Sequence, residues 1–268
     1  MMGRSVALVS VISAGLCAFA MPSRAEDAVE RAEMRGTALF WYDRAAWVTS
    51  DDLQARLPVE RYAEIGGWIV TPAAGGYHVD YLGQGEAAER VVYSADVEGR
   101  TVRNAVIFPK GSEPMLGQTA RAMARALGIA RRAIEQRSDW TSCAPAPFNT
   151  IVLPPEGGVI PVYFLTPQTQ TDSIPFGGHY EIDVDERGKV GAQRAFSRSC
   201  IEVPANAGET DGNVADAYLT HVLDAHPTEI HVFQQYGLGV PLMVATAPQS
   251  IWRVENGQIE PVVESGRE

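Results

Sequence analysis

The chain has 268 residues, of which 46% are hydrophobic, and a formal net charge of −11 at pH 7. A surface this acidic repels nucleic acids and anionic membranes, which excludes polyanions as general partners. The length is sufficient for one large domain or two small ones.

The first 25 residues have the layout of a secretory signal peptide. Arg4 supplies a positive start, Ser5–Ala20 is an apolar run, and Ser23-Arg24-Ala25 offers small residues before a cleavage site. The apolar run is shorter than the roughly 20 residues that a bilayer requires, so we expect a cleaved leader rather than a membrane anchor. The sequence therefore predicts a periplasmic or secreted protein without a membrane span after cleavage.

Cleavage after Ala25 leaves residues 26–268, which we interpret as a single domain. It removes two arginines and no acid, so 20 basic residues face 33 acidic ones and the net charge becomes −13. Two cysteines remain, Cys143 and Cys200, and an even pair in an oxidising compartment predicts a disulfide. This bond closes a loop of about 58 residues and contributes roughly 4 kcal/mol on the loop-entropy model. Because neither cysteine lies in a Cys-x-x-Cys motif, we expect a structural rather than a catalytic role.

In chain order, the mature sequence first predicts two short helices with a strand between them. A charged helix is expected over Glu26–Arg35, ended by Gly36, and is followed by a strand over Ala38–Tyr42. Ser50 and the two acids after it cap the second helix, which Pro58 stops.

Four strands separated by glycine-containing turns are predicted next, at Gly67–Thr71, Tyr77–Leu82, Arg90–Val97 and Thr101–Phe108. Tight turns between successive strands indicate an antiparallel meander. The clearest helix is predicted over 114–137, where apolar residues recur at helical spacing.

The second half predicts further strands, over Asn149–Leu153, Pro161–Thr166, His179–Asp185, Lys189–Ser197, Glu229–Gln234, Pro241–Thr246, Ile251–Glu255 and from Ile259 onward. A short helix is expected over Asn213–Leu223. The sequence thus predicts an α+β fold of mainly antiparallel sheet. We expect two meander-like halves joined by the long central helix 114–137, with short flanking helices.

Candidate metal ligands are His221, His226, Glu229 and His231, which lie within eleven residues. Imidazole and carboxylate groups suit zinc, and a strand would place Glu229 and His231 on one side. However, the spacing of His221 and His226 is not the i, i+4 spacing of a helical zinc site, and Pro227 interrupts the path. The alternative is a polar connection between a helix and a strand.

Polar residues alternate along the predicted strand 179–185, at His179, Glu181, Asp183 and Asp185. We expect this to be the solvated face of a one-sided sheet. The alternative is a carboxylate ladder that serves a cation or an acid–base pair.

Three arginines, Arg121, Arg125 and Arg132, lie close together on the polar face of the helix 114–137. They are candidates for binding an anionic group, and the alternative is the solvated face of an amphipathic helix. Five tryptophans, at 41, 47, 68, 140 and 252, are expected to pack in or around the core, whereas an exposed cluster would indicate carbohydrate or peptide binding.

Signatures of serine hydrolases and nucleotide binding do not occur in the sequence: there is no Gly-x-Ser-x-Gly, Ser-x-x-Lys or glycine-rich phosphate loop. No cofactor is expected. The first hypothesis for function is a non-enzymatic binding or interaction module that uses its sheet surfaces. Its partner would be an unknown envelope protein or a small ligand. The alternatives are a metal-assisted hydrolase that uses the His221–His231 region and an envelope-assembly factor.

Five stretches of the sequence carry a resemblance: Ala146–Pro155, Phe176–Val190, Phe196, Ser199-Cys200 and Pro227–Phe233. Together they resemble a group of uncharacterised exported proteins of proteobacteria. The resemblance implies a periplasmic location and no known activity, so no functional residues transfer. Within it, Tyr180–Ser199 is similar to the hairpin of the C-terminal domain of TonB-type energy transducers. The helix and the Arg-Trp-x-Phe-x-Pro strand that follow in those domains are missing here.

Overall fold

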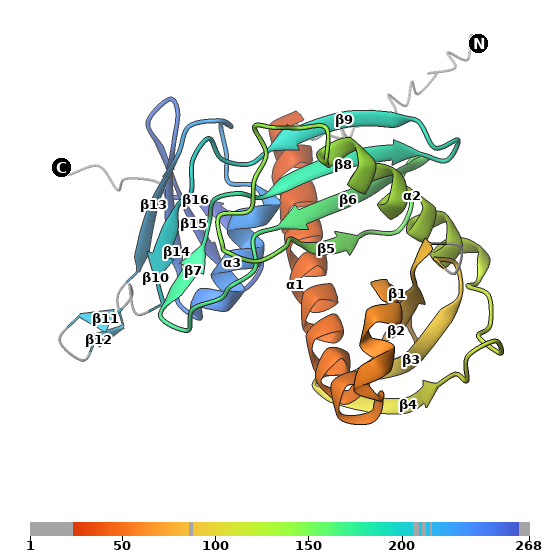
Figure 1. The fold of residues 1–268 in the computed structure, drawn as a ribbon. Helices are drawn as coiled ribbons and strands as arrows, with labels where there is room; N and C mark the ends of the chain where they lie inside the picture. The colour runs from red at the N-terminus through yellow and green to blue at the C-terminus, as the bar shows by residue number, and fades with distance from the viewer. Residues whose placement is uncertain (1–23, 86–87, 206–208, 211–212, 215, 263–268) are drawn as a thin grey trace, which may run out of the picture.

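The structure, a computed structural model, describes residues 24–85, 88–205, 209–210, 213–214 and 216–262. Within these residues the chain forms an α+β fold with three four-stranded sheets and two two-stranded ones (Figure 1). This confirms the predicted fold class. The predicted signal peptide lies outside the described residues, apart from positions 24 and 25, where the first helix begins.

One long helix, α1 (Arg24–Arg56), occupies the region where the sequence predicts two short helices and a strand. The predicted helix end at Gly36 is wrong, because this glycine lies inside α1 where α3 (Glu229–Leu238) packs against it. A Cβ atom at position 36 would lie 2.5 Å from the Cβ of Val232. Gly36 therefore permits a close approach of two helices rather than a turn.

The predicted strand over Ala38–Tyr42 is also wrong, since these residues are part of α1. Leu39 is fully buried, and Phe40 stacks on Tyr236 of α3 with ring centroids 4.5 Å apart. Ser50, predicted to begin a new helix, continues α1. A helix with neighbours on several sides carries apolar residues around its circumference and loses the one-sided pattern by which sequences predict helices.

A short 3-10 helix, η1 (Val59–Glu64), leads from α1 into the first sheet. This sheet is an antiparallel meander, as predicted, with the order β1 (Ile65–Ala73), β2 (Gly76–Gly83), β3 (Val91–Glu98) and β4 (Thr101–Ile107). Its buried face shares a hydrophobic core with the C-terminal part of α1, which includes Leu53.

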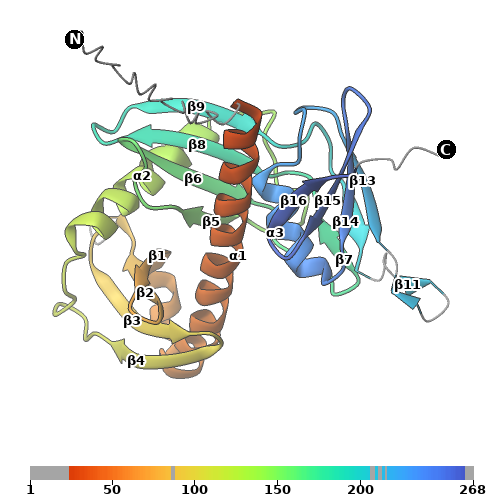
Figure 2. The ribbon, with the colours of Figure 1, turned by 180° about the vertical axis from the view of Figure 1, so that it is seen from behind.

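The predicted helix 114–137 is confirmed with shorter bounds as α2 (Gln118–Ile134). It is followed by the antiparallel second sheet, whose order is β5 (Asn149–Val152), β6 (Val159–Leu165), β8 (Tyr180–Asp185) and β9 (Val190–Ala195). α2 packs on one face of this sheet, and α1 passes over the other face (Figures 1 and 2). Both faces of β6 and β8 are therefore covered.

The remaining strands form a third region on the other side of α1 (Figure 2). Its main sheet has the order β13 (Ala217–His221), β14 (Leu242–Thr246), β15 (Ser250–Glu255) and β16 (Gln258–Pro261), and the β13–β14 pair is parallel. The two-stranded sheets pair β7 (Ser173–Pro175) with β10 (Glu202–Pro204), and β11 (Glu209–Thr210) with β12 (Asn213–Val214).

Two predicted elements in this region are wrong. The predicted strand over Glu229–Gln234 is α3, and the described part of the predicted helix Asn213–Leu223 forms β12 and β13. α3 begins with a capping box between Thr228 and His231 and ends at Gly239 in the left-handed conformation. Most of its residues are buried, so its apolar positions again lack the helical period.

The predicted disulfide between Cys143 and Cys200 is confirmed. It joins the segment after α2 to the segment after β9 and so links the second sheet to the third region. In the part of the chain that the structure describes, no helix is both long and apolar enough to cross a membrane.

Gly36→Ala is expected to lower the free energy of unfolding by about 1–3 kcal/mol, because the added methyl group must push α1 and α3 apart. A matched control is Gly128→Ala in α2, where the nearest atom to the new Cβ is a flexible side-chain nitrogen of Arg132 at 3.8 Å. That change is expected to raise stability by roughly 0.5–1 kcal/mol. Urea denaturation measures both, and equal effects would contradict the close helix crossing.

Replacing Cys143 and Cys200 together with serine is expected to lower the free energy of unfolding by roughly 4 kcal/mol. The physical reason is that the open chain gains conformational freedom when the cross-link is removed. The measurement is denaturant unfolding without reductant, with the reduced wild-type protein as the control. A double variant as stable as the oxidised protein would show that the disulfide contributes nothing.

Candidate functional site

The four candidate metal ligands occupy three different elements. His221 ends β13, His226 lies in the connection after it, and Glu229 and His231 belong to the first turn of α3. The rings of His221 and His231 contact each other edge to face, with centroids 4.7 Å apart. The structure thus brings two of the four side chains together.

Each of these histidines already has a hydrogen-bond partner. His221 Nε2 lies 2.8 Å from Oδ2 of Asp224, and Nδ1 of His231 accepts the backbone N–H of Thr228 at 2.9 Å. His226 bonds to the carbonyl of the residue after it. Across the residues that the structure describes, no group of three or more His, Cys, Asp or Glu side chains could hold a metal ion.

The expected solvated face of the strand 179–185 is wrong at its first two polar positions. His179 is fully buried and Glu181 is 6% exposed, and side chains of the two helices contact them: Arg35 of α1 bonds to Glu181, and Gln234 of α3 lies 3.3 Å from His179. Burial lowers the pKa of His179 to about 4, so the ring is neutral at neutral pH. It bonds to the backbone carbonyl of Pro175 at 2.8 Å.

Glu181 is part of a buried cluster that includes Arg35 of α1, Tyr163 of β6 and Glu229 of α3. Arg35 Nη1 donates to Oε1 of Glu181 at 2.8 Å and to the Tyr163 hydroxyl at 3.3 Å. The Tyr163 hydroxyl also lies 3.1 Å from one carboxyl oxygen of Glu181 and 3.1 Å from one of Glu229. The side chains of three secondary-structure layers therefore meet at a single hydroxyl group.

The Tyr163 hydroxyl carries one proton, so it can donate to only one of its two carboxyl neighbours. The other contact requires a proton on a carboxyl group. Burial and the negative charge of Glu229 raise the pKa of Glu181 to about 7, although the positive charge of Arg35 acts in the opposite direction. Glu181 is therefore the group that we expect to hold the extra proton below neutral pH.

Arg194 of β9 extends the cluster toward the histidines. Its guanidinium lies 3.5 Å from Glu229 and 2.9 Å from Asp224. Burial by itself would raise the pKa of Asp224, but the hydrogen bond to His221 and the charge of Arg194 lower it to about 2. Asp224 is thus ionised and accepts from both neighbours. A continuous chain of polar contacts joins Arg35 in α1 to His221 in β13.

A cavity of about 230 Å³ opens beside His221 and His231. Both side chains are more than nine-tenths buried. Seven of the thirteen lining side chains are apolar, and three of the six polar ones, Arg198, Ser199 and Thr220, are exposed. The complete lining is Phe176, Phe196, Ser197, Arg198, Ser199, Ile201, Leu219, Thr220, His221, Val222, Leu223, Ile230 and His231.

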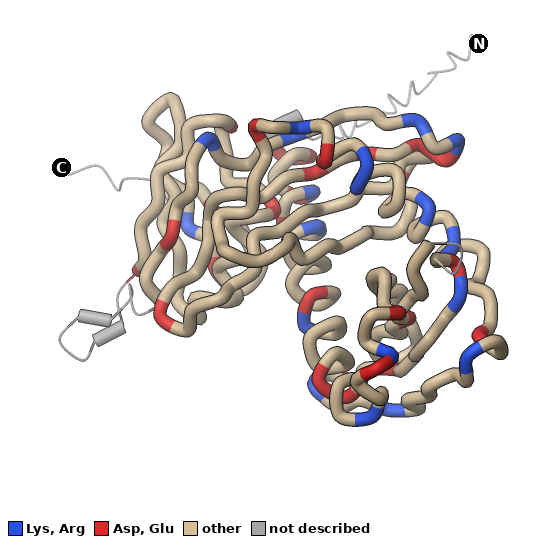
Figure 3. Tube along the Cα trace, viewed as in Figure 1, with Lys and Arg blue, Asp and Glu red and all other residues tan. Residues whose placement is uncertain are grey.

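Of the three arginines of α2 that the sequence predicts to bind an anion, two pair with the same glutamate. Glu89 bonds to Arg125 at 2.6 Å and lies 3.5 Å from Arg121, while Arg132 is exposed. Figure 3 shows acidic and basic positions interspersed along the described chain. The structure does not gather the three arginines into an unpaired cationic surface.

The tryptophans differ in exposure, and Trp68 and Trp252 are half-buried. Trp140 is buried, whereas Trp41 and Trp47 on α1 are 38% and 48% exposed. Arg44 lies over the Trp47 ring at 4.8 Å. This is a small exposed aromatic surface, and neither tryptophan lines the cavity beside His221 and His231.

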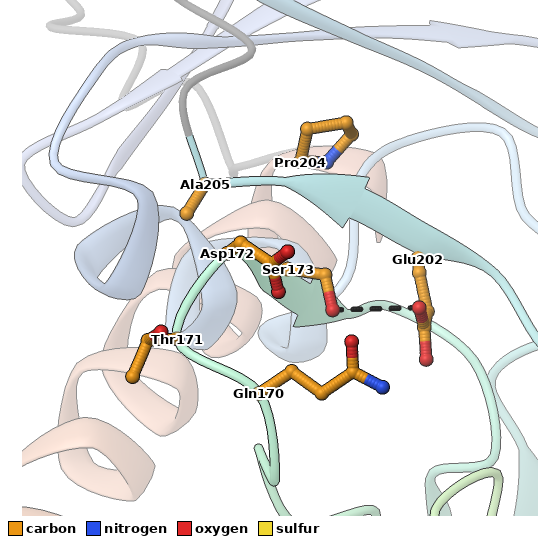
Figure 4. Close-up of a pocket in the computed structure, with 7 residues that line it drawn as sticks. All are labelled: Gln170, Thr171, Asp172, Ser173, Glu202, Pro204 and Ala205. Atoms are coloured by element: carbon orange, nitrogen blue, oxygen red, sulfur yellow. Dashed lines mark hydrogen bonds between the residues drawn. The ribbon is translucent and has the colours of Figure 1, made fainter.

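A larger cavity, about 770 Å³, opens beside β7 and β10 and is lined by Gln170, Thr171, Asp172, Ser173, Glu202, Pro204 and Ala205. Figure 4 shows Ser173 bonded to Glu202 between the two strands, at 3.4 Å. This lining contains two carboxyl groups, of Asp172 and Glu202, but no histidine and no cation. The cavity beside the histidines therefore combines more chemical functions in a more enclosed space.

Sequence reasoning did not find Arg35, Tyr163, Arg194 or Asp224 as members of this site. Two local signals were available: Asp224 follows His221 by three residues, and His231 follows Thr228 by three, which is the spacing of a capping box. Arg35 and Tyr163 come from distant parts of the chain, and no spacing connects them with α3.

The stability of Glu181→Gln relative to wild type is expected to increase as the pH rises from about 5 to about 8, by roughly 1–3 kcal/mol. Because the pKa of Glu181 is about 7 in the folded protein and ordinary in the unfolded chain, folding takes up a proton in this range. The wild type therefore loses stability with rising pH, whereas glutamine stays uncharged. Urea denaturation at several pH values measures the difference.

The control for this experiment is Glu186→Gln, at an exposed position in the turn after β8. Its side chain lies outside the buried cluster, so this change leaves the shared proton in place. A Glu181→Gln stability difference that does not change with pH would contradict the shared proton.

No protein-family model matches the chain, and no curated protein or solved structure matches it. The function is therefore inferred from the geometry of the site.

Proposed function

We propose that this chain is an exported, non-enzymatic binding module that holds a small ligand in the cavity beside His221 and His231. Export is supported by the leader-like residues 1–25, by the resemblance to exported proteobacterial proteins, and by the Cys143–Cys200 disulfide, which suits an oxidising compartment. The ligand site is a cavity rather than a sheet surface.

The observation that carries this proposal is the lining of the cavity. Ligand sites are concave and mostly apolar, with a few polar groups that orient the ligand. Here the apolar wall includes Phe176, Phe196 and Ile230, and the buried polar groups are two imidazoles. A cavity of about 150 Å³ binds benzene in another protein, so 230 Å³ accommodates a substituted six-membered ring.

Binding is favoured over hydrolysis by the partners of the polar groups. Asp224 and His221 have the arrangement of an orienting acid and a base. Yet Ser197 donates its hydroxyl to a backbone carbonyl, and no hydroxyl group of the described residues hydrogen-bonds to His221. The metal-assisted alternative needs His226 and Glu229 beside the two rings, whereas these side chains bond elsewhere.

The test is a panel of ring compounds with about 6–12 heavy atoms, measured by thermal shift on the mature protein. Leu219→Trp and Leu223→Trp each place a large ring at the cavity wall, so both variants are expected to lose the shift. The control is Tyr218→Trp, on the opposite face of β13, where the side chain is 74% exposed. It is expected to bind as the wild type does.

Two outcomes would contradict the proposal. One is a panel in which no compound stabilises the wild type, or in which both blocked variants bind as well as the control. The other is chromatographic recovery of a bound compound in a chemically changed form, which would indicate an enzyme.

A further inference from the structure

The hydrogen bond at the start of α3 determines which ring nitrogen of His231 carries a proton. Nδ1 accepts the backbone N–H of Thr228 at 2.9 Å, as the third residue of the capping box. An imidazole nitrogen that accepts a hydrogen bond has no proton of its own, so the neutral ring is protonated at Nε2. Burial, together with the nearby His221 and Arg194, lowers the pKa of His231 to about 3 and keeps the ring neutral.

The Nε2–H group of His231 is a donor without a partner among the described residues. The ring is 4% exposed and lines the cavity. This nitrogen is not among the buried atoms without a partner, so it is open to solvent, and a ligand oxygen in the cavity can replace water as its acceptor. His231 is therefore prepared to donate a hydrogen bond and, because Nδ1 is occupied, not to accept one.

His221 has the opposite arrangement. Its Nε2–H donates to the ionised carboxylate of Asp224 at 2.8 Å. In the neutral ring the remaining nitrogen, Nδ1, is an acceptor, and it has no partner among the residues that the structure describes. Both rings line the cavity and their centroids lie 4.7 Å apart, so an uncharged His221 would supply an acceptor close to the donor of His231.

The rest of the lining selects against charge. Apart from the two histidines, the buried lining residues are apolar, and the one cationic lining residue, Arg198, is exposed. A carboxylate in contact with the imidazoles would lose its hydration and gain a single neutral N–H donor, which is insufficient compensation. A hydroxyl group can accept from one imidazole and donate to the other at the same time.

We propose that the cavity binds small, uncharged ring compounds that carry a hydroxyl group, with that hydroxyl placed between His231 and His221. This assignment of ligand class rests on the proposed binding function. Phenol is the simplest member of the class, and toluene and benzoate are matched probes of similar size.

Titration calorimetry with the three probes at about pH 8, where free imidazole is neutral, tests the proposal. In a cavity without hydrogen-bond partners, burial of the hydroxyl would make phenol weaker than toluene by about tenfold. With both imidazoles engaged, phenol is expected to bind more tightly than toluene, and benzoate to bind weakest.

His231→Gln separates the role of the donor from that of the helix cap. Glutamine is a standard third residue of a capping box, so its side-chain oxygen can replace Nδ1 as acceptor. It does not reproduce the position of the Nε2–H group. Phenol affinity is expected to fall by about fivefold or more, while toluene affinity stays the same.

The outcomes distinguish failure of the ligand class from failure of the binding function. Tighter binding of toluene or benzoate than of phenol would overturn the hydroxyl assignment and leave the cavity as a binding site. Equal loss of phenol and toluene in His231→Gln would also overturn it. Absence of binding by all three probes would overturn both proposals.

Discussion

The contact between α1 and α3 at Gly36 is the constraint on which the rest of the structure depends. With no side chain at this position, α3 lies directly against α1, and the neighbouring Arg35 reaches across to Glu181 and Tyr163. The same approach brings Glu229, in the first turn of α3, to the Tyr163 hydroxyl. The lack of a side chain at position 36 thus allows α1, the second sheet and α3 to contribute side chains to one polar cluster.

Burying this polar cluster costs desolvation free energy, and the charges within the cluster limit that cost. Isolated buried charges lose several kcal/mol of hydration, so each must have a partner of opposite sign or lose its charge. Arg35 and Arg194 supply positive charge beside Glu181, Glu229 and Asp224, and Tyr163 lies between two carboxyl groups. The shared proton follows from the same requirement, since two unprotonated carboxylates cannot both receive the single phenol proton.

The start of α3 contributes one of the two histidines of the cavity. His231 stabilises the helix terminus through Nδ1, and its other ring nitrogen has no partner among the described residues. Its protonation is therefore decided by the backbone rather than by pH. Asp224 accepts a hydrogen bond from Nε2 of His221, at the end of the chain of contacts that starts at Arg35. These hydrogen bonds engage one nitrogen of each imidazole within the protein, so only the other nitrogen of each ring is left for a ligand.

The sequence by itself determined the elements whose pattern is local: the meander β1–β4, the amphipathic α2, the hairpin β8–β9 and the Cys143–Cys200 pair. It also indicated His221 and His231, though as metal ligands. Only the tertiary structure decided the continuity of α1, the helical state of α3 and the burial of Glu181. The physical reason is that α1 and α3 are packed on several sides and show no one-sided period. Whether the polar face of a strand is exposed to water or covered by another layer depends on residues far away in the sequence. Arg35, which contacts Glu181, is more than a hundred positions from it.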